Sequence, residues 1–169
     1  MSKAASAETG AGADGLSNRS HRARIVVVGE FNSGKTALVN ALVGAPVLTP
    51  SSIVHTAHLT VVGYAARPSL TAETSSRRRR PVAWDGISDL ALDDIRRLHV
   101  GAPLERLKRF SVVDTPGLGF ADSESDRRSL QACRGAGAVI WCTPAMQAWK
   151  ASEEQAWLAL PASVRARGI

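Results

Sequence analysis

A glycine-rich stretch of eight residues, Gly29 to Thr36, constrains this chain more than any other feature. It reads Gly-Glu-Phe-Asn-Ser-Gly-Lys-Thr and meets the pattern Gly-x-x-x-x-Gly-Lys-Ser/Thr in full. An apolar run at 24–28 precedes it, and apolar residues at helical spacing follow over 35–43. A glycine-rich turn between a buried strand and a helix N-terminus directs free backbone N–H groups at an anion. The sequence therefore predicts a loop that binds the phosphates of a nucleoside triphosphate.

The polar residues of this loop have distinct expected roles. Lys35 is expected to neutralise the β- and γ-phosphates, and the Thr36 hydroxyl to ligate Mg²⁺. The predicted nucleotide-binding residues of the loop are Gly29, Glu30, Phe31, Asn32, Ser33, Gly34, Lys35, Thr36 and Ala37.

A second apolar run, at 110–113, ends in the carboxylate of Asp114. Ligands of open α/β sheets bind at the carboxyl ends of the strands, so Asp114 is expected to hold Mg²⁺ opposite Thr36, through water. Thr115-Pro116-Gly117 follows. The Gly117 N–H is predicted to bond the γ-phosphate, and the loop to relax when that phosphate is lost.

The rest of the chain alternates between strand and helix patterns. Residues 1–20 contain almost no large apolar side chain, so we predict a disordered segment over 1–22 and one domain over 23–169. A loop is expected at 45–57 and an exposed polar insertion at 67–81. Further strands are predicted at 59–65, 109–113 and 136–142, and helices at 87–98, 123–134 and 152–160. This alternation favours an α/β fold of three layers with a mainly parallel sheet.

The net charge of +6 is concentrated in the block Arg77 to Arg80 and in three arginines before the first strand. Either the block is a solvated loop or it favours anionic partners, namely nucleotide phosphates or acidic lipid headgroups. Nucleic acid is a poor candidate, because no aromatic residues are interleaved with the arginines. Cys133 and Cys142 are expected to be free thiols. No run approaches the roughly 18 apolar residues of a membrane span, so we expect a cytoplasmic protein, peripheral at a membrane if it meets one.

The two phosphate motifs together resemble those of the bacterial dynamin-like GTPases. The similarity lies in the loop at 29–36, in Ala-Leu-Val-Asn-Ala-Leu-Val-Gly after it, and in Asp-Thr-Pro-Gly-Leu-Gly at 114–119. Residues 48–57 resemble the first switch of that family, which implies that Thr56 closes over Mg²⁺ and the γ-phosphate. The resemblance covers about 23–160 and implies a P-loop, G-domain-like fold. It also implies binding of GTP and GDP, Mg²⁺-dependent hydrolysis, and coupling to assembly or membrane remodelling.

The predicted catalytic residues are Lys35, Asn32 and Thr56. Ras-type sites place a water-orienting glutamine directly after the switch glycine, and this chain has Leu118 there. Asn32 matches an asparagine that helps to hold K⁺ in potassium-dependent GTPases, which implies cation-stimulated turnover and a homodimer across the nucleotide face. The alternative is that Asn32 serves only the geometry of the loop.

No Asn/Thr-Lys-x-Asp motif for guanine recognition is present in the sequence. We therefore expect a GTPase domain that is incomplete at its C-terminal side, with Gly168-Ile169 as the first residues of a fifth strand. The apolar edge at 139–142 would then need cover, from Trp149 and Trp157 or from a partner. Two alternatives to the GTPase remain open: a nucleotide-dependent interaction module with little turnover, and a P-loop ATPase.

Overall fold

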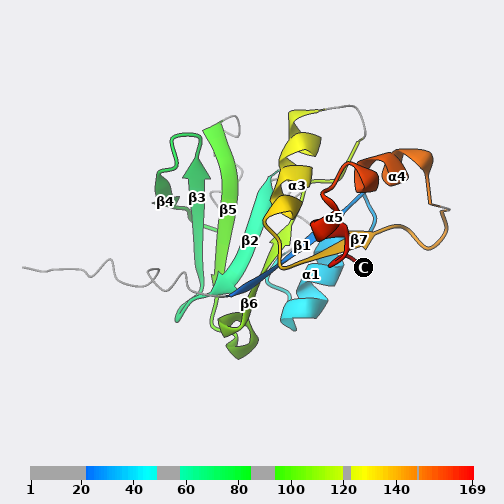
Figure 1. Ribbon diagram of the computed structural model, residues 1–169. Helices are drawn as coiled ribbons and strands as arrows, with labels where there is room; N and C mark the ends of the chain where they lie inside the picture. Colours follow the sequence, from blue (N-terminus) through cyan, green and yellow to red (C-terminus); the bar gives the residue numbers. More distant parts are fainter. Residues whose placement is uncertain (1–21, 49–57, 85–93, 120–122, 148) are drawn as a thin grey trace, which may run out of the picture.

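A mixed sheet of seven strands forms the centre of the molecule (Figure 1). The computed structural model describes residues 22–48, 58–84, 94–119, 123–147 and 149–169. The strand order is β4-β3-β5-β2-β6-β1-β7. The elements in chain order are β1 (Ala23–Gly29), α1 (Lys35–Val43), β2 (Leu59–Tyr64), β3 (Ser69–Thr74), β4 (Arg79–Pro81), β5 (Ile95–Ala102), the 3₁₀ helix η3 (Glu105–Lys108), β6 (Phe110–Asp114), α3 (Glu124–Arg134), β7 (Ala138–Cys142), α4 (Ala151–Leu158) and α5 (Ala162–Arg165).

Three of the neighbouring strand pairs are parallel and three are antiparallel. The parallel pairs are β6–β1, β1–β7 and β2–β5, and the antiparallel pairs are β2–β6, β5–β3 and β3–β4. The α/β prediction is confirmed. The parallel pairs are the two around β1 and the pair β2–β5 in the middle of the sheet, so the sheet is mixed. β1 is an interior strand between β6 and β7, and its two faces are covered by the cores that contain Val27 on one side and Val26 and Val28 on the other. Burial on both faces explains its continuous apolar sequence.

Two apolar cores lie on the two faces of the sheet, so the predicted three layers are present. On one face, Val39 and Val43 of α1 pack with Val27 and Val112 of the sheet. On the other, Cys133 of α3 packs with Val26, Val28, Val113, Val139 and with Val164 of α5. The alternation of β1 side chains between the two cores is the period of two that a strand imposes.

The predicted helix at 87–98 is wrong over its last residues, which begin strand β5. Ile95 and Leu98 are both buried on the α1 face, three residues apart, which imitates helical spacing. The cause is a bulge. Thr74 of β3 pairs with Ile95 and Glu73 with Arg97, so residue 96 is an extra residue on β5. Residues 85–93 lie outside the described part of the chain.

The segment 67–81, predicted as an exposed insertion, contributes two strands to the sheet. β3 pairs with β5 along its length, and Leu70 and Ala72 enter the core. β4 continues the sheet beyond β3 and is exposed at all three of its residues. The polar composition of the segment therefore reflects an outer strand of the sheet and its turn.

The last residues of the chain lie beside β7 and cover its free edge. Gly168 forms a parallel bridge with Val139, and backbone hydrogen bonds join the strand to Arg167 and Ile169 at 2.8–3.2 Å. Gly168-Ile169, predicted as the first residues of a fifth strand, thus pair with β7 through one isolated bridge and do not form a strand of their own within the described residues. Trp149 and Trp157 both lie edge-on against the Trp141 ring of β7, at 5.6 and 5.7 Å between ring centroids. They therefore cover a side chain of β7, whereas residues 167–169 cover its backbone edge.

Two further predictions concern the N-terminal segment and the absence of a membrane-spanning helix. The predicted disordered segment lies almost wholly outside the described residues, since 1–21 are not described. Among the helices of the described ranges, none combines the length and the apolar character needed to cross a membrane.

Candidate nucleotide site

The glycine-rich loop lies where its sequence predicted it, between the end of β1 and the start of α1. Gly34 caps α1 with φ +86°, and Asn32 also has a left-handed backbone at φ +58°. Asparagine tolerates this conformation better than most residues because its short side chain bonds locally. The structure therefore gives Asn32 a role in loop geometry, which was one of the two interpretations of this residue.

Lys35 extends over the loop rather than into solvent. Its side-chain ammonium donates to the carbonyl oxygen of Glu30 and to the hydroxyl of Ser33, the latter at 3.4 Å. Burial lowers the pKa of Lys35, and the nearby carboxylate of Asp114 opposes that shift. A cation held in a desolvated loop binds phosphate oxygens strongly, because little water competes with them.

Thr36 and Asp114 meet across the site. The Thr36 hydroxyl donates to Oδ2 of Asp114 at 2.7 Å, although the residues are 78 positions apart. The other carboxylate oxygen, Oδ1, is buried and accepts no hydrogen bond from the described residues. Burial raises the pKa of Asp114 to about 6, against the lowering effects of the Thr36 hydroxyl and the Lys35 ammonium.

These two residues fit a magnesium ion. A hydroxyl and a carboxylate are oxygen ligands of the kind that Mg²⁺ takes, and an unpaired buried carboxylate oxygen is an acceptor that a cation or its water would satisfy. No group of three or more His, Cys, Asp or Glu side chains gathers elsewhere in the described ranges as an alternative centre. With two protein ligands, the remaining positions would go to phosphate and water.

The loop after β6 returns close to the glycine-rich loop. The Leu118 N–H donates to the Gly29 carbonyl at 3.0 Å, and the Thr115 hydroxyl donates to the Val27 carbonyl at 2.9 Å. A side chain at Gly117 would have its Cβ 2.6 Å from Cα of Phe31, so glycine is required for this close approach. The two phosphate motifs are thus joined by backbone contacts.

Helix α3 anchors the far end of this loop. The Gly119 N–H donates to Oδ1 of Asp126 at 3.0 Å, and the hydroxyl of Ser129 donates to the Pro116 carbonyl at 3.4 Å. Ser123 caps the helix by accepting from the Asp126 N–H at 3.0 Å. Sequence reasoning did not find Asp126, because its partner is a backbone group that only the folded loop places beside it.

The predicted residues thus fall into three groups. Gly29, Lys35, Thr36, Asp114 and Gly117 lie together at the carboxyl end of the β1–β6 pair. Phe31, Asn32, Gly34 and Ala37 are exposed on the loop and the first turn of α1, where Glu30 and Ser33 are half-buried. Residues 49–57 of the predicted first switch, Thr56 among them, lie outside the described residues, so the role of Thr56 stays a prediction.

Two contacts of the loop come from residues that the sequence did not single out. Lys150, at the start of α4, forms an ion pair with the carboxylate of Glu30 at 2.7 Å. The carbonyl of Cys142 lies where a Cβ on Gly29 would be, which explains the glycine at this position. Cys142 is the last residue of β7, and Lys150 follows that strand. No local pattern indicates either contact, since each joins residues more than 100 positions apart.

The glycine-rich loop, the opposed carboxylate and the α/β sheet define a P-loop domain of the G-domain type. The sequence model of the dynamin family matches residues 25–160. The chain therefore belongs to the dynamin family.

Individual relatives agree with this assignment. The chain is 28% identical over 137 residues to dynamin-like protein 2 of Campylobacter jejuni, covering 78% of this chain and 22% of the relative. It is 31% identical over 116 residues to the isoniazid-induced protein IniC of Mycobacterium tuberculosis, covering 64% of this chain and 23% of IniC. A solved structure of an oligomerised bacterial dynamin pair, described as a mechanism for long-range sensing and tethering of membranes, superposes with a TM-score of 0.60 at 22% identity, covering 86% of this chain and 23% of that one. The chain thus spans less than a quarter of the length of these relatives.

Proposed function

We propose that this domain binds GTP together with Mg²⁺ and hydrolyses it. The observation that carries the proposal is the meeting of Thr36 with Asp114 beneath the glycine-rich loop, with one buried carboxylate oxygen left for a cation. Membership of the dynamin family supports guanine over adenine, although the guanine-recognition motif is absent from this sequence. ATP is therefore the competing ligand that an experiment has to exclude.

The proposed chemistry assigns a task to each part of the site. The backbone N–H groups of the loop and the ammonium of Lys35 would hold the β- and γ-phosphates in line for attack by water. Mg²⁺, held by Thr36 and Asp114, would supply neutralising charge on the phosphate oxygens. The Gly117 N–H would bond the γ-phosphate, so that its departure releases the loop anchored by α3.

Nucleotide binding is tested by titrating fluorescent GTP and ATP analogues with Mg²⁺ into the wild-type chain and into Lys35→Ala. Removing one charge-assisted contact should weaken GTP by about 10- to 100-fold. Lys108→Ala is the matched control, because Lys108 pairs at the surface with Glu105 and lies outside the site. Equal affinities for GTP and ATP would favour the ATPase alternative, and equal binding by wild type and Lys35→Ala would disprove the site.

A second function, nucleotide-dependent interaction with little turnover, rests on Leu118. This side chain is buried in the core beneath α3 and occupies the position where Ras-type sites have a water-orienting glutamine. Single-turnover phosphate release separates the two functions. Tight GTP binding with no release above the uncatalysed rate would favour the interaction module.

Potassium is the further cofactor that we propose to test. If Asn32 helps to hold K⁺ beside the phosphates, phosphate release should be faster in potassium than in sodium buffer, and Asn32→Ser should abolish the difference. A homodimer across the nucleotide face would add a concentration dependence of the rate. Equal rates in both buffers would argue against a K⁺ site. Asn32 would then serve only the geometry of the loop, where its backbone is left-handed.

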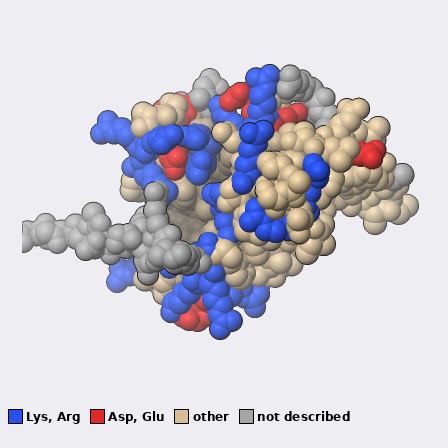
Figure 2. Space-filling model, viewed as in Figure 1, with Lys and Arg blue, Asp and Glu red and all other residues tan. Residues whose placement is uncertain are grey.

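An anionic membrane surface is the partner proposed for the Arg77–Arg80 block. Arg79 and Arg80 lie on β4 at the outer edge of the sheet, where basic side chains are prominent in Figure 2. The similar bacterial dynamin pair is itself described as tethering membranes, which supports this choice of partner. Sedimentation with anionic liposomes should fall when the four arginines become glutamine, and unchanged sedimentation would reject this proposal.

A further inference from the structure

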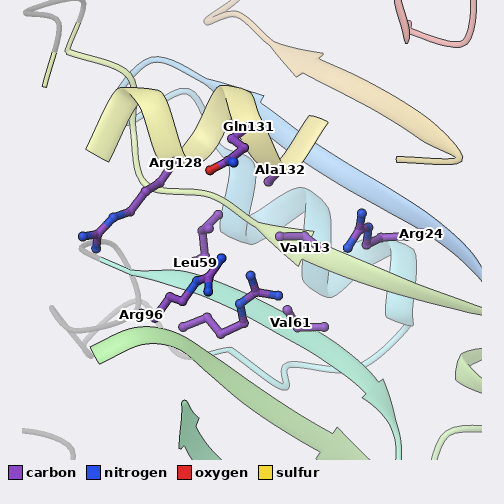
Figure 3. A pocket seen from close by; sticks show the side chains of 9 residues that line it. Arg24, Leu59, Val61, Arg96, Val113, Arg128, Gln131 and Ala132 are labelled. Carbon is purple, nitrogen blue, oxygen red and sulfur yellow. The ribbon is translucent and has the colours of Figure 1, made fainter. Parts of the chain in front are cut away.

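A pocket lined by four arginines lies on the α3 face of the sheet. It encloses about 210 Å³ between α3 and the strands β1, β2, β5 and β6 (Figure 3). None of its lining residues belongs to the glycine-rich loop or contacts Mg²⁺ in the proposed site. The lining residues are Arg24, Arg96, Arg97, Arg128, Leu59, Val61, Val113, Gln131 and Ala132.

The positive charge of this pocket is only partly balanced. Arg128 pairs with Glu124 at 3.0 Å, and Arg97 lies 3.7 Å from the Glu73 carboxylate, which also serves Arg79 and His99. Arg24 donates one hydrogen bond to the carbonyl of Gly135. Among the described residues, no carboxylate pairs with Arg24, and the Arg96 side chain takes part in no hydrogen bond or ion pair.

Arg97 shows that the nearby positive charges disfavour one another. Its Nε is buried and donates no hydrogen bond within the described residues, because the Glu73 oxygen of its ion pair lies 3.7 Å away, beyond hydrogen-bond distance. Burial lowers the pKa of Arg97; Glu73 opposes the shift, and Arg96 and Arg24 add to it. An anion in the pocket would reduce the repulsion among Arg24, Arg96 and Arg97.

The floor of the pocket differs from its rim. Leu59, Val61 and Val113 form an apolar floor on β2 and β6, and the arginines stand around them. In Figure 3, Arg96 lies across the pocket from Gln131 of α3, and Arg24 and Arg128 mark its two ends. Guanidinium forks match phosphate oxygens, and an apolar floor suits the organic part of a phosphate ester.

We propose that this pocket is a second anion site, which binds a small soluble phosphate monoester through Arg96 and its neighbouring arginines. The enclosed volume favours a small ligand over a flat polyanionic surface. The ligand would contact β6 and α3, the elements that flank the loop at 115–119, since Val113 precedes that loop and α3 follows it.

The test uses phenyl phosphate as the probe, titrated by calorimetry without Mg²⁺ into the full chain carrying Lys35→Ala. That background weakens phosphate binding by the glycine-rich loop. We expect saturable binding that is tighter than for inorganic phosphate, because the ring would cover the apolar floor. Arg96→Gln should weaken the binding about tenfold or more.

Matched variants separate a built site from general attraction to a basic surface. Arg134→Gln removes one exposed charge from the same helix outside the pocket and should leave the affinity within about twofold. Ala132→Leu fills the pocket without changing charge and should also weaken binding, which keeps the test decisive if Arg96→Gln fails to fold. Circular dichroism checks each variant.

Three outcomes would overturn the proposal. They are equal weakening by Arg96→Gln and Arg134→Gln, unchanged binding in Ala132→Leu, and absence of saturable binding at millimolar probe. A vesicle arm compares phosphatidylcholine with and without phosphatidic acid. If the pocket variants reduce binding to phosphatidic acid vesicles but phenyl phosphate does not bind, the ligand is a lipid headgroup and the soluble ester is rejected.

Discussion

At the scale of single residues, Asp114 combines a proposed function with a cost to the stability of the fold. It is 1% exposed, and within the described ranges only one of its two carboxylate oxygens accepts a hydrogen bond. Such a group persists in a native protein when a ligand completes its coordination. The residue proposed to hold the metal ion thus lowers the stability of the fold when no metal ion is bound.

We predict that Asp114→Asn separates these two properties. The amide keeps the size of the side chain and an acceptor for Thr36, while the buried charge is lost. GTP affinity should no longer increase when Mg²⁺ is added, whereas the free energy of unfolding in EDTA should stay the same or rise by about 1 kcal/mol. Urea denaturation and nucleotide titration with and without Mg²⁺ measure both; a variant that keeps the magnesium effect would contradict the assignment.

Cys133 provides a second prediction at this scale. Its side chain is fully buried in the core beneath α3, and burial raises the pKa of its thiol to about 12. The thiolate fraction at pH 8 should therefore be at least about 100-fold below that of an exposed cysteine. Mass spectrometry after iodoacetamide treatment should show Cys133 protected in the folded chain and alkylated in urea; equally fast alkylation in both states would contradict the burial.

At the scale of elements, Glu73 joins the three outer strands of the sheet. From β3 it contacts Arg79 of β4 at 3.5 Å, and Arg97 and His99 of β5 at 3.7 and 3.0 Å. Burial would raise the pKa of Glu73, but the His99 hydrogen bond and the two arginines outweigh it and lower the pKa overall. The folded state therefore favours the charged carboxylate.

We predict that Glu73→Gln lowers the free energy of unfolding by about 1–2 kcal/mol at pH 7. Because the folded pKa lies below the unfolded one, the stabilisation is present above about pH 4.5 and is lost as the pH falls through the folded pKa. The difference between wild type and Glu73→Gln should therefore shrink at pH 3.5. Urea denaturation at the two pH values measures it, and a difference that grows on acidification would contradict the sign.

One element, the start of β5, was wrongly predicted as a helix from its sequence pattern. The spacing of Ile95 and Leu98 predicted a helix because a bulge opposite Thr74 adds a residue to β5 and breaks the period of two. A register irregularity belongs to the pairing of two strands, so one strand's sequence does not contain it. The strand β1, by contrast, has no bulge in its pairings and was correctly predicted from sequence.

At the scale of the whole molecule, the end of the sheet at β7 depends on the last residues of the chain. Residues 167–169 make three backbone hydrogen bonds to Val139 and Trp141. A Cβ on Gly168 would collide with the Trp157 ring, so the bridge and the tryptophan cluster are packed as one unit. An uncovered β7 would present a row of free N–H and C=O groups.

We predict that deleting residues 167–169 destabilises the chain by about 1–3 kcal/mol, from the loss of these hydrogen bonds. The freed edge should also increase self-association, seen by size-exclusion chromatography at rising concentration. Replacing Arg165 and Arg167 by glutamine is the control, because it lowers the charge of this region without shortening its backbone. A deletion variant that stays monomeric and equally stable would show that the edge needs no cover.

The sequence by itself determined the phosphate loop, the strand that ends in Asp114, and the α/β class, because each rests on a local pattern: glycines at fixed spacing, an apolar run, a helix start. The tertiary structure decided what joins distant residues. It brought Thr36 to Asp114, Lys150 to Glu30, and four arginines from β1, β5 and α3 around one pocket. The physical reason is that contacts between elements depend on strand order and register, which hydrogen bonding and packing settle only once the sheet has formed.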